Sequence, residues 1–182
     1  MLEQEMKIPV ASLADVRRRV VARGGTLLDP FELEDNWVFD DAVGSLAAAG
    51  RLLRLRRFGR RSTLTLKGAA HFSAGVKSRS EMETEVANGE QALAILTALG
   101  FSPIRRYQKR RETFSLDRVL VSLDETPMGS FVELEGRAEQ LPAVAFALDL
   151  DPHAAALGTY LDLWAAYRAA HPGTPQDMVF PP

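Results

Sequence analysis

Residues 51–68 read Arg-Leu-Leu-Arg-Leu-Arg-Arg-Phe-Gly-Arg-Arg-Ser-Thr-Leu-Thr-Leu-Lys-Gly. Two runs in which apolar and polar residues alternate flank the Gly-Arg-Arg segment at 59–61, and this pattern predicts a hairpin of two strands at 51–58 and 62–68. Side chains of a strand point to opposite faces with a period of two. The leucines of this hairpin therefore lie on one face, and its charged and hydroxyl residues lie on the other.

The same alternation recurs along the chain. Further strands are expected at 2–8, 35–40, 79–86, 104–114, 118–125 and 130–136. Any one strand fits an ordinary sheet with its charges in solvent, but seven segments that each gather charges on one face indicate a shared charged surface. The residues on these faces are Glu3, Glu5, Lys7, Arg54, Arg56, Thr63, Thr65, Lys67, Arg79, Glu81, Glu83, Glu85, Arg105, Tyr107, Lys109, Arg111, Ser122, Asp124, Glu133 and Glu135.

Three helical stretches accompany the strands. They are expected at 12–23, at 88–99 and at 138–171, the last broken near Asp151-Pro152, with a loop at 69–78. If these helices cover the apolar face of the sheet, its charged face must look inward. The prediction is an α+β fold, a closed or nearly closed antiparallel β-barrel of about eight strands with helices packed outside. We assign residues 1–171 to one domain and expect the Pro-rich C-terminal tail, 172–182, to be poorly ordered.

The composition narrows the classes of function. The chain has 182 residues and no cysteine, which excludes disulfides, zinc–thiolate sites and thiol nucleophiles. It begins with acidic residues and has no apolar run of membrane-spanning length, so a cytoplasmic protein without a membrane partner is expected. No Gly-rich phosphate loop of the P-loop type occurs.

The charge is distributed unevenly. Residues 51–111 hold 14 of the 22 lysines and arginines but four acids, although the net charge of the chain is −2. Such a segment often binds nucleic acid, but an RNA-binding barrel would show aromatic residues between its basic ones, and only Tyr107 does so here. We therefore expect no nucleic-acid polymer as a partner.

A charged barrel interior is costly unless its charges pair or bind ions. Lysine and arginine facing carboxylates across a lumen suit a polyanion together with divalent cations. Carboxylates without cysteine or clustered histidine favour Mg²⁺ or Mn²⁺.

Several motifs resemble, in order, those of the CYTH proteins, also called triphosphate tunnel metalloenzymes. Glu3-Gln4-Glu5-Met6-Lys7 is similar to the family's N-terminal Glu-x-Glu-x-Lys signature. The later motifs are Leu53-Arg54-Leu55-Arg56, Leu64-Thr65-Leu66-Lys67-Gly68, Arg79-Ser80-Glu81-Met82-Glu83-Thr84-Glu85, Lys109-Arg110-Arg111, Leu123-Asp124, Gly129-Ser130-Phe131-Val132-Glu133-Leu134-Glu135 and Thr159-Tyr160-Leu161. The resemblance spans residues 3 to 161.

The resemblance implies a role for each group of charges. The implied metal ligands are Glu3, Glu5, Asp124, Glu133 and Glu135. The implied substrate-binding residues are Lys7, Arg54, Arg56, Lys67, Arg79, Lys109 and Arg111. Glu5 and Lys7 are the expected catalytic residues. One departure concerns thiamine triphosphatase: some members have a lysine near the C-terminus, whereas this chain has none after Lys109.

By this resemblance we expect a Mg²⁺- or Mn²⁺-dependent hydrolase of a triphosphate-containing small molecule, which could be inorganic tripolyphosphate, thiamine triphosphate or a nucleoside triphosphate. The alternatives are a class IV-type adenylyl cyclase and a non-catalytic module that binds polyphosphate or nucleotides. A homodimer is compatible with the resemblance, because dimers are common in the family. The roles of Glu81, Glu83 and Glu85 stay open.

Overall fold

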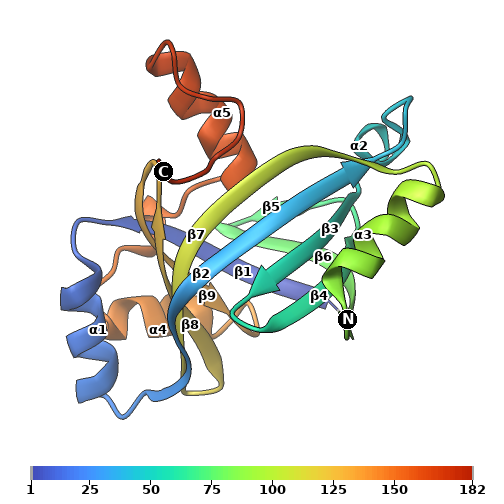
Figure 1. Cartoon of the computed structure of the whole chain (residues 1–182). Coiled ribbons are helices and arrows are strands. Elements are labelled where there is room, and N and C mark those ends of the chain that lie inside the picture. The colour runs from blue at the N-terminus through green and yellow to red at the C-terminus, as the bar shows by residue number, and fades with distance from the viewer. Residues whose placement is uncertain (1, 182) are drawn as a thin grey trace.

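The computed structural model describes residues 2–181, which form a β-barrel with helices around it (Figure 1). The strands are β1 Leu2–Val10, β2 Thr26–Asp40, β3 Leu52–Phe58, β4 Arg61–Lys67, β5 His71–Ser73, β6 Val76–Val86, β7 Ser102–Leu116, β8 Val119–Thr126 and β9 Gly129–Glu135. Their order in the sheet is β1-β9-β8-β7-β2-β3-β4-β6-β5, and an additional β1–β6 pairing closes it. The predicted closed antiparallel barrel of eight strands is thus confirmed, and β5 lies outside it on β6.

Strand β6 closes the barrel by changing partners along its length. Lys77 to Ser80 pair with β1, and Glu81 to Val86 pair with β4. The predicted β3–β4 hairpin has the register Phe58↔Arg61. Gly59 in its turn adopts a φ of 57°, a left-handed conformation that costs glycine little.

Helices flank the barrel. They are α1 Leu13–Ala22, α2 Ser45–Ala48, α3 Gly89–Ala98, α4 Leu141–Ala147, the 3₁₀ helix η1 Pro152–Ala154 and α5 Tyr160–Ala170. Ser12 and Asn88 cap α1 and α3, because their side-chain oxygens accept the amide hydrogens of Asp15 and Gln91. Within residues 2–181, no helix has the length and apolarity needed to span a membrane.

The apolar core lies outside the barrel wall. Helices α1 and α4 pack on one side of it, where Val16, Val20 and Leu141 meet Met6 and Val132. Helix α3 packs on the opposite side, where Leu96 joins the outward leucines of β3 and β4 (Figure 1). Because both covered faces are apolar, the opposite faces of the same strands bring their charged residues into the barrel.

The structure corrects two expectations about secondary structure. Strand β2 begins at Thr26 rather than at residue 35, and register shifts against β7 in its first half explain why regular alternation is missing there. Residues 69–78 are not one loop, since they contain β5 and the start of β6. Pairing with β1 makes that start a strand, and a single sequence does not show this partner.

The expectation of a poorly ordered tail is wrong for residues 172–181. Met178 is fully buried and forms a β-bridge with Tyr107. Its carbonyl oxygen accepts the amide hydrogen of Gln108 at 2.7 Å, and its own amide donates to the Arg106 carbonyl at 3.1 Å. We call residues 174–181 the C-terminal strap. It pairs with the part of β7 that β8 does not cover.

Candidate functional site

A cavity of about 850 Å³ lies within the barrel, and charged side chains dominate its wall. The sequence-predicted cations that line it are Lys7, Arg54, Arg56, Lys67, Arg79, Lys109 and Arg111. The predicted carboxylates that line it are Glu3, Glu5, Glu133 and Glu135. The structure therefore brings these residues together from six strands, β1, β3, β4, β6, β7 and β9.

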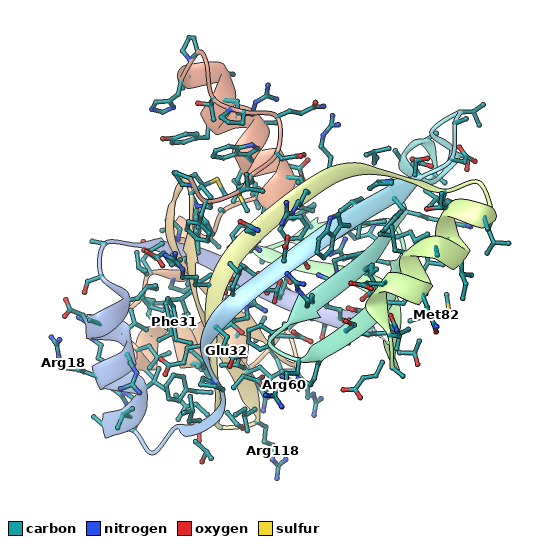
Figure 2. All side chains as sticks on the ribbon, in the orientation of Figure 1. Arg18, Phe31, Glu32, Arg60, Met82 and Arg118 are labelled. Carbon is teal, nitrogen blue, oxygen red and sulfur yellow. The ribbon has the colours of Figure 1, made fainter. Side chains whose placement is uncertain are left out.

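Strand periodicity explains the segregation of charge. On β1, Glu5 and Lys7 are buried toward the cavity, whereas Met6 and Ile8 belong to the outer apolar core. Basic residues at the turns behave differently. Arg60 and Arg118 are exposed and project from the ends of the barrel (Figure 2).

Glu3 sits between two cations. Its carboxylate lies 2.6 Å from Lys67 Nζ and 3.0 Å from Arg79 Nε. Burial alone would raise the pKa of Glu3, but the two cations outweigh it and hold that pKa at about 2. Glu3 is therefore ionised at neutral pH and anchors both cations in the wall.

Lys7 joins a second group of ion pairs. Its Nζ lies 2.8 Å from Glu133 Oε2 and 3.4 Å from Glu5 Oε1. Although burial opposes a charged lysine, these carboxylates raise the pKa of Lys7 above its usual value. Lys77 also contacts Glu5, and the sequence does not point to it because it falls in the segment predicted as a loop.

Glu135 has a different environment from the other carboxylates. No lysine or arginine among residues 2–181 forms a salt bridge with it. Burial, followed by the charges of Glu133 and Glu3, raises the pKa of Glu135 to about 7. Glu135 is therefore the cavity carboxylate that holds its negative charge least readily.

The carboxylates of the cavity fit a divalent cation by their chemistry. Glu5 and Glu135 are directly paired across β1 and β9, and no lysine or arginine within residues 2–181 forms a salt bridge with Glu135. Oxygen ligands of this kind suit Mg²⁺ or Mn²⁺. In the described part of the chain no three acidic or histidine side chains already converge as a metal site, because Glu3, Glu5 and Glu133 face lysine and arginine instead.

Asp124 does not line the cavity, unlike the other predicted metal ligands. It is fully buried behind the wall, where its two oxygens each lie 2.6 Å from a guanidinium nitrogen of Arg111. Lys109 Nζ at 3.2 Å and the Tyr160 hydroxyl at 2.5 Å contact the same carboxylate. With its oxygens used in this way, Asp124 is placed to hold cations in position rather than to face a ligand.

Glu34 is a cavity residue that the sequence does not reveal. It is 1% exposed and lies 3.6 Å from both Arg56 and Lys109. Burial opposes ionisation, but Arg56 and Lys109 hold the pKa of Glu34 well below its usual value. The predicted strand starts at residue 35, so Glu34 fell outside any alternating pattern.

The acidic residues of β6 lie at the edge of the same cavity. Glu81 is 3.0 Å from Lys67, and Glu83 accepts a 2.6 Å hydrogen bond from Thr65. Glu83 also lies 3.4 Å from Arg54, whose guanidinium donates to the hydroxyl of Tyr107 at 3.2 Å. All of them line the cavity, so β6 adds carboxylates next to the cations of β3 and β4.

Comparison with known proteins gives a consistent result. The model of the CYTH domain matches residues 1–150. A candidate adenylate cyclase from Vibrio parahaemolyticus superposes with a TM-score of 0.81 at 20% identity, covering 91% of this chain and 98% of that one. The PH1012 protein from Pyrococcus horikoshii gives 0.74 at 23% identity, with 88% and 98% covered.

A third protein of similar structure is HpAC1 from Hippeastrum. It is a candidate adenylyl cyclase with a dominant triphosphatase activity, and it superposes with a TM-score of 0.67 at 19% identity over 92% of this chain and 96% of that one. A comparison with curated proteins found no match. At these identities the solved structures establish a shared fold.

Proposed function

Because this chain belongs to the CYTH family, we propose that it hydrolyses a small-molecule triphosphate inside the barrel with the help of Mg²⁺ or Mn²⁺. The observation that carries the proposal is the set of lysines and arginines that converge on one cavity from β1, β3, β4, β6 and β7. A single phosphate group needs fewer cations than this, whereas a triphosphate chain carries enough charge to engage them all.

Each type of side chain has a distinct task in this proposal. Arg56 would bind phosphate oxygens with its planar fork, and Lys67 would bind them as a point charge. Arg111, whose Nε and Nη2 are bound to Asp124, would add its charge and its Nη1 hydrogens. Lys7, between Glu5 and Glu133, would neutralise the charge that develops on the transferred phosphoryl group. Positioning and electrostatic stabilisation would then supply most of the rate.

The carboxylates that we propose as metal ligands are Glu3, Glu5, Glu133 and Glu135. A bound divalent cation would neutralise phosphate charge and polarise phosphoryl oxygens. Glu5 would in addition orient the attacking water. Asp124 stays outside this set, because its oxygens hold Arg111, Lys109 and Tyr160.

The direct test is an assay of purified protein with Mg²⁺ or Mn²⁺ and a panel of triphosphates. The panel comprises tripolyphosphate, thiamine triphosphate and nucleoside triphosphates, with separate measurement of phosphate, pyrophosphate and cyclic AMP. We expect phosphate release. The dominant triphosphatase activity of HpAC1 supports hydrolysis over cyclisation on the same fold.

Neighbouring arginines of β3 offer a matched pair of variants. Arg56 lines the cavity, whereas the side chain of Arg57 is 62% exposed on the outer face. Arg56→Ala should lower kcat/KM by about tenfold or more, and Arg57→Ala should leave it nearly unchanged. Equal loss in both variants would place the reaction outside the barrel.

The same assay distinguishes the two alternative functions, an adenylyl cyclase and a non-catalytic binding module, from hydrolysis. Equal amounts of pyrophosphate and cyclic AMP from ATP would identify a cyclase. Tight binding of tripolyphosphate without turnover of any triphosphate would identify a non-catalytic module.

A further inference from the structure

Tyr160, the first residue of α5, reaches from that helix into the wall of the cavity. It is 6% exposed and lines the cavity itself. Its hydroxyl lies 2.5 Å from Asp124 Oδ2, and its ring packs edge-on against Phe131 with centroids 5.5 Å apart. The family resemblance assigns no role to this tyrosine.

Three cations of the cavity meet at this tyrosine. Lys7 Nζ and Lys109 Nζ lie 4.3 Å and 4.8 Å from the centre of its ring, within cation–π range. Arg111 is reached through Asp124, which binds the guanidinium with both oxygens. The hydroxyl of Tyr160 thus fixes the carboxylate that fixes Arg111, and its ring borders the two lysines.

The C-terminal strap holds α5 in this place. Trp164 Nε1 donates to the Gln176 carbonyl at 3.1 Å, and Arg168 Nε donates to the Thr174 carbonyl at 3.2 Å. Met178 of the strap lies in the same buried cluster as Tyr160 and Trp164. The strap is itself anchored to β7, the strand that carries Lys109 and Arg111, so both ends of the Tyr160–Asp124 contact are tied to one strand.

We propose that Tyr160 is a positioning residue that acts through Asp124 to hold Arg111 and Lys109 ready for a polyphosphate anion. The C-terminal strap would keep α5 docked for this purpose. The inference rests on the proposed function for the identity of the anion, but the order of the Arg111 side chain can be measured without any substrate.

The first experiment compares Tyr160→Phe with Tyr167→Phe in the full chain. Both variants lose one hydroxyl from α5, but Tyr167 stacks on Trp164 and His171 and is not in the cavity wall. The NMR signal of the Arg111 Nε–H group in the ligand-free protein should shift or broaden in Tyr160→Phe and stay unchanged in Tyr167→Phe. An unchanged Arg111 signal in Tyr160→Phe would overturn the proposal whatever the protein binds.

The second experiment measures the Kd of tripolyphosphate by calorimetry at a temperature where every variant is folded. Tyr160→Phe should weaken binding by about tenfold, the effect of losing one well-placed charge-assisted contact, and should raise KM by more than it lowers kcat. In an Asp124→Asn background, Tyr160→Phe should change Kd by less than about twofold, because the intermediary is already altered.

The strap is tested in the same way by Met178→Ala, which should raise Kd and perturb the Arg111 signal in the same direction as Tyr160→Phe.

A full, additive effect of Tyr160→Phe in the Asp124→Asn background would show that the tyrosine does not act through Asp124. Wild-type protein that ignores tripolyphosphate but keeps the expected Arg111 signals would instead overturn the proposed function and leave the positioning role standing.

Discussion

Replacement of Glu135 by Gln should stabilise the metal-free protein, by an amount that is absent below pH 4.5 and grows up to about pH 7. Burial and the charges of Glu133 and Glu3 raise the pKa of Glu135 from 4.5 to about 7. A carboxyl group whose pKa is higher in the folded than in the unfolded chain lowers the stability of the fold once it ionises. Glutamine keeps the size of the side chain and removes this charge.

The size of the effect follows from the pKa shift. One pKa unit corresponds to about 1.4 kcal/mol, so the rise from 4.5 to about 7 sets an upper value of about 3 kcal/mol. Because the side chain is partly exposed, solvent and salt screen part of this, and we expect about 1–3 kcal/mol at pH 9. The penalty in the wild type is absent below pH 4.5, grows as pH rises from 4.5 to about 7, and levels off above that.

Urea unfolding followed by tryptophan fluorescence measures the prediction, with excess EDTA and a series of pH values from about 5 to 9. Glu3→Gln is the control with the opposite sign, since it removes the carboxylate that lies between Lys67 and Arg79 and should destabilise the protein at neutral pH. Excess Mg²⁺ should narrow the difference between wild type and Glu135→Gln, because the cation binds the wild-type folded state more tightly.

Two results would refute this reasoning. The first is a Glu135→Gln variant that is no more stable than the wild type at pH 9. The second is a gain in stability that is equally large at pH 5, because a pH-independent gain has its origin in packing and not in charge.

Four further predictions concern the charged residues of the cavity. The wild type should lose about 3 kcal/mol of stability from Glu3 alone as pH falls from 4.5 to about 2, because Glu3 stabilises the fold only while its carboxylate is ionised. The loss would appear in the unfolding free energy measured as a function of acid pH, and the Glu3→Gln variant should not show it. Tripolyphosphate should raise the Tm of the wild type and protect Lys67→Ala much less, and equal protection of both proteins would place the anion elsewhere. Arg56→Ala should lose roughly 1.5–3 kcal/mol of binding free energy for the anion, and Arg56→Lys should recover only part of it. Turnover should stop in excess EDTA and in Glu133→Gln, with the circular dichroism spectrum of that variant unchanged, and activity that persists in EDTA would contradict a metal requirement.

Most of the barrel can be predicted from the sequence, because most of its strands alternate between apolar and polar residues and gather several charges on one face. Arg54 and Arg56 against the leucines of β3 are a clear case. The first half of β2 lacks this signal, since bulges against β7 break its alternation. The C-terminal strap also lacks a regular alternation of apolar and polar residues, because Met178 is held by its pairing with β7 and not by its own neighbours in the chain.

Prediction of the candidate site from the sequence is limited in the same way, because it depends on regular alternation along a strand. Residues on regular strands, such as Lys67 and Glu133, are predictable as cavity residues from their period. Glu34 and Lys77 are not, because they lie where a strand is recognised only through its partner. The inward position of Asp124 is also predictable, but its burial behind Arg111 depends on Tyr160, which comes from a helix 36 residues further along the chain.

Closure of the barrel has a consequence for the order in which the protein folds. The β1–β6 pairing that closes the barrel joins Glu5 to Lys77, and the β1–β9 pairing joins Glu5 to Glu135. Both partners of β1 therefore lie far from it along the sequence. Pairings with such high contact order form late, because the entropy of a long loop must be lost before they stabilise the chain. Glu5 and Lys7 therefore meet Glu133 and Lys77 only when the last seam has formed. Any ion or anion that needs these groups together can bind the closed barrel alone, and its binding would slow the opening of that seam.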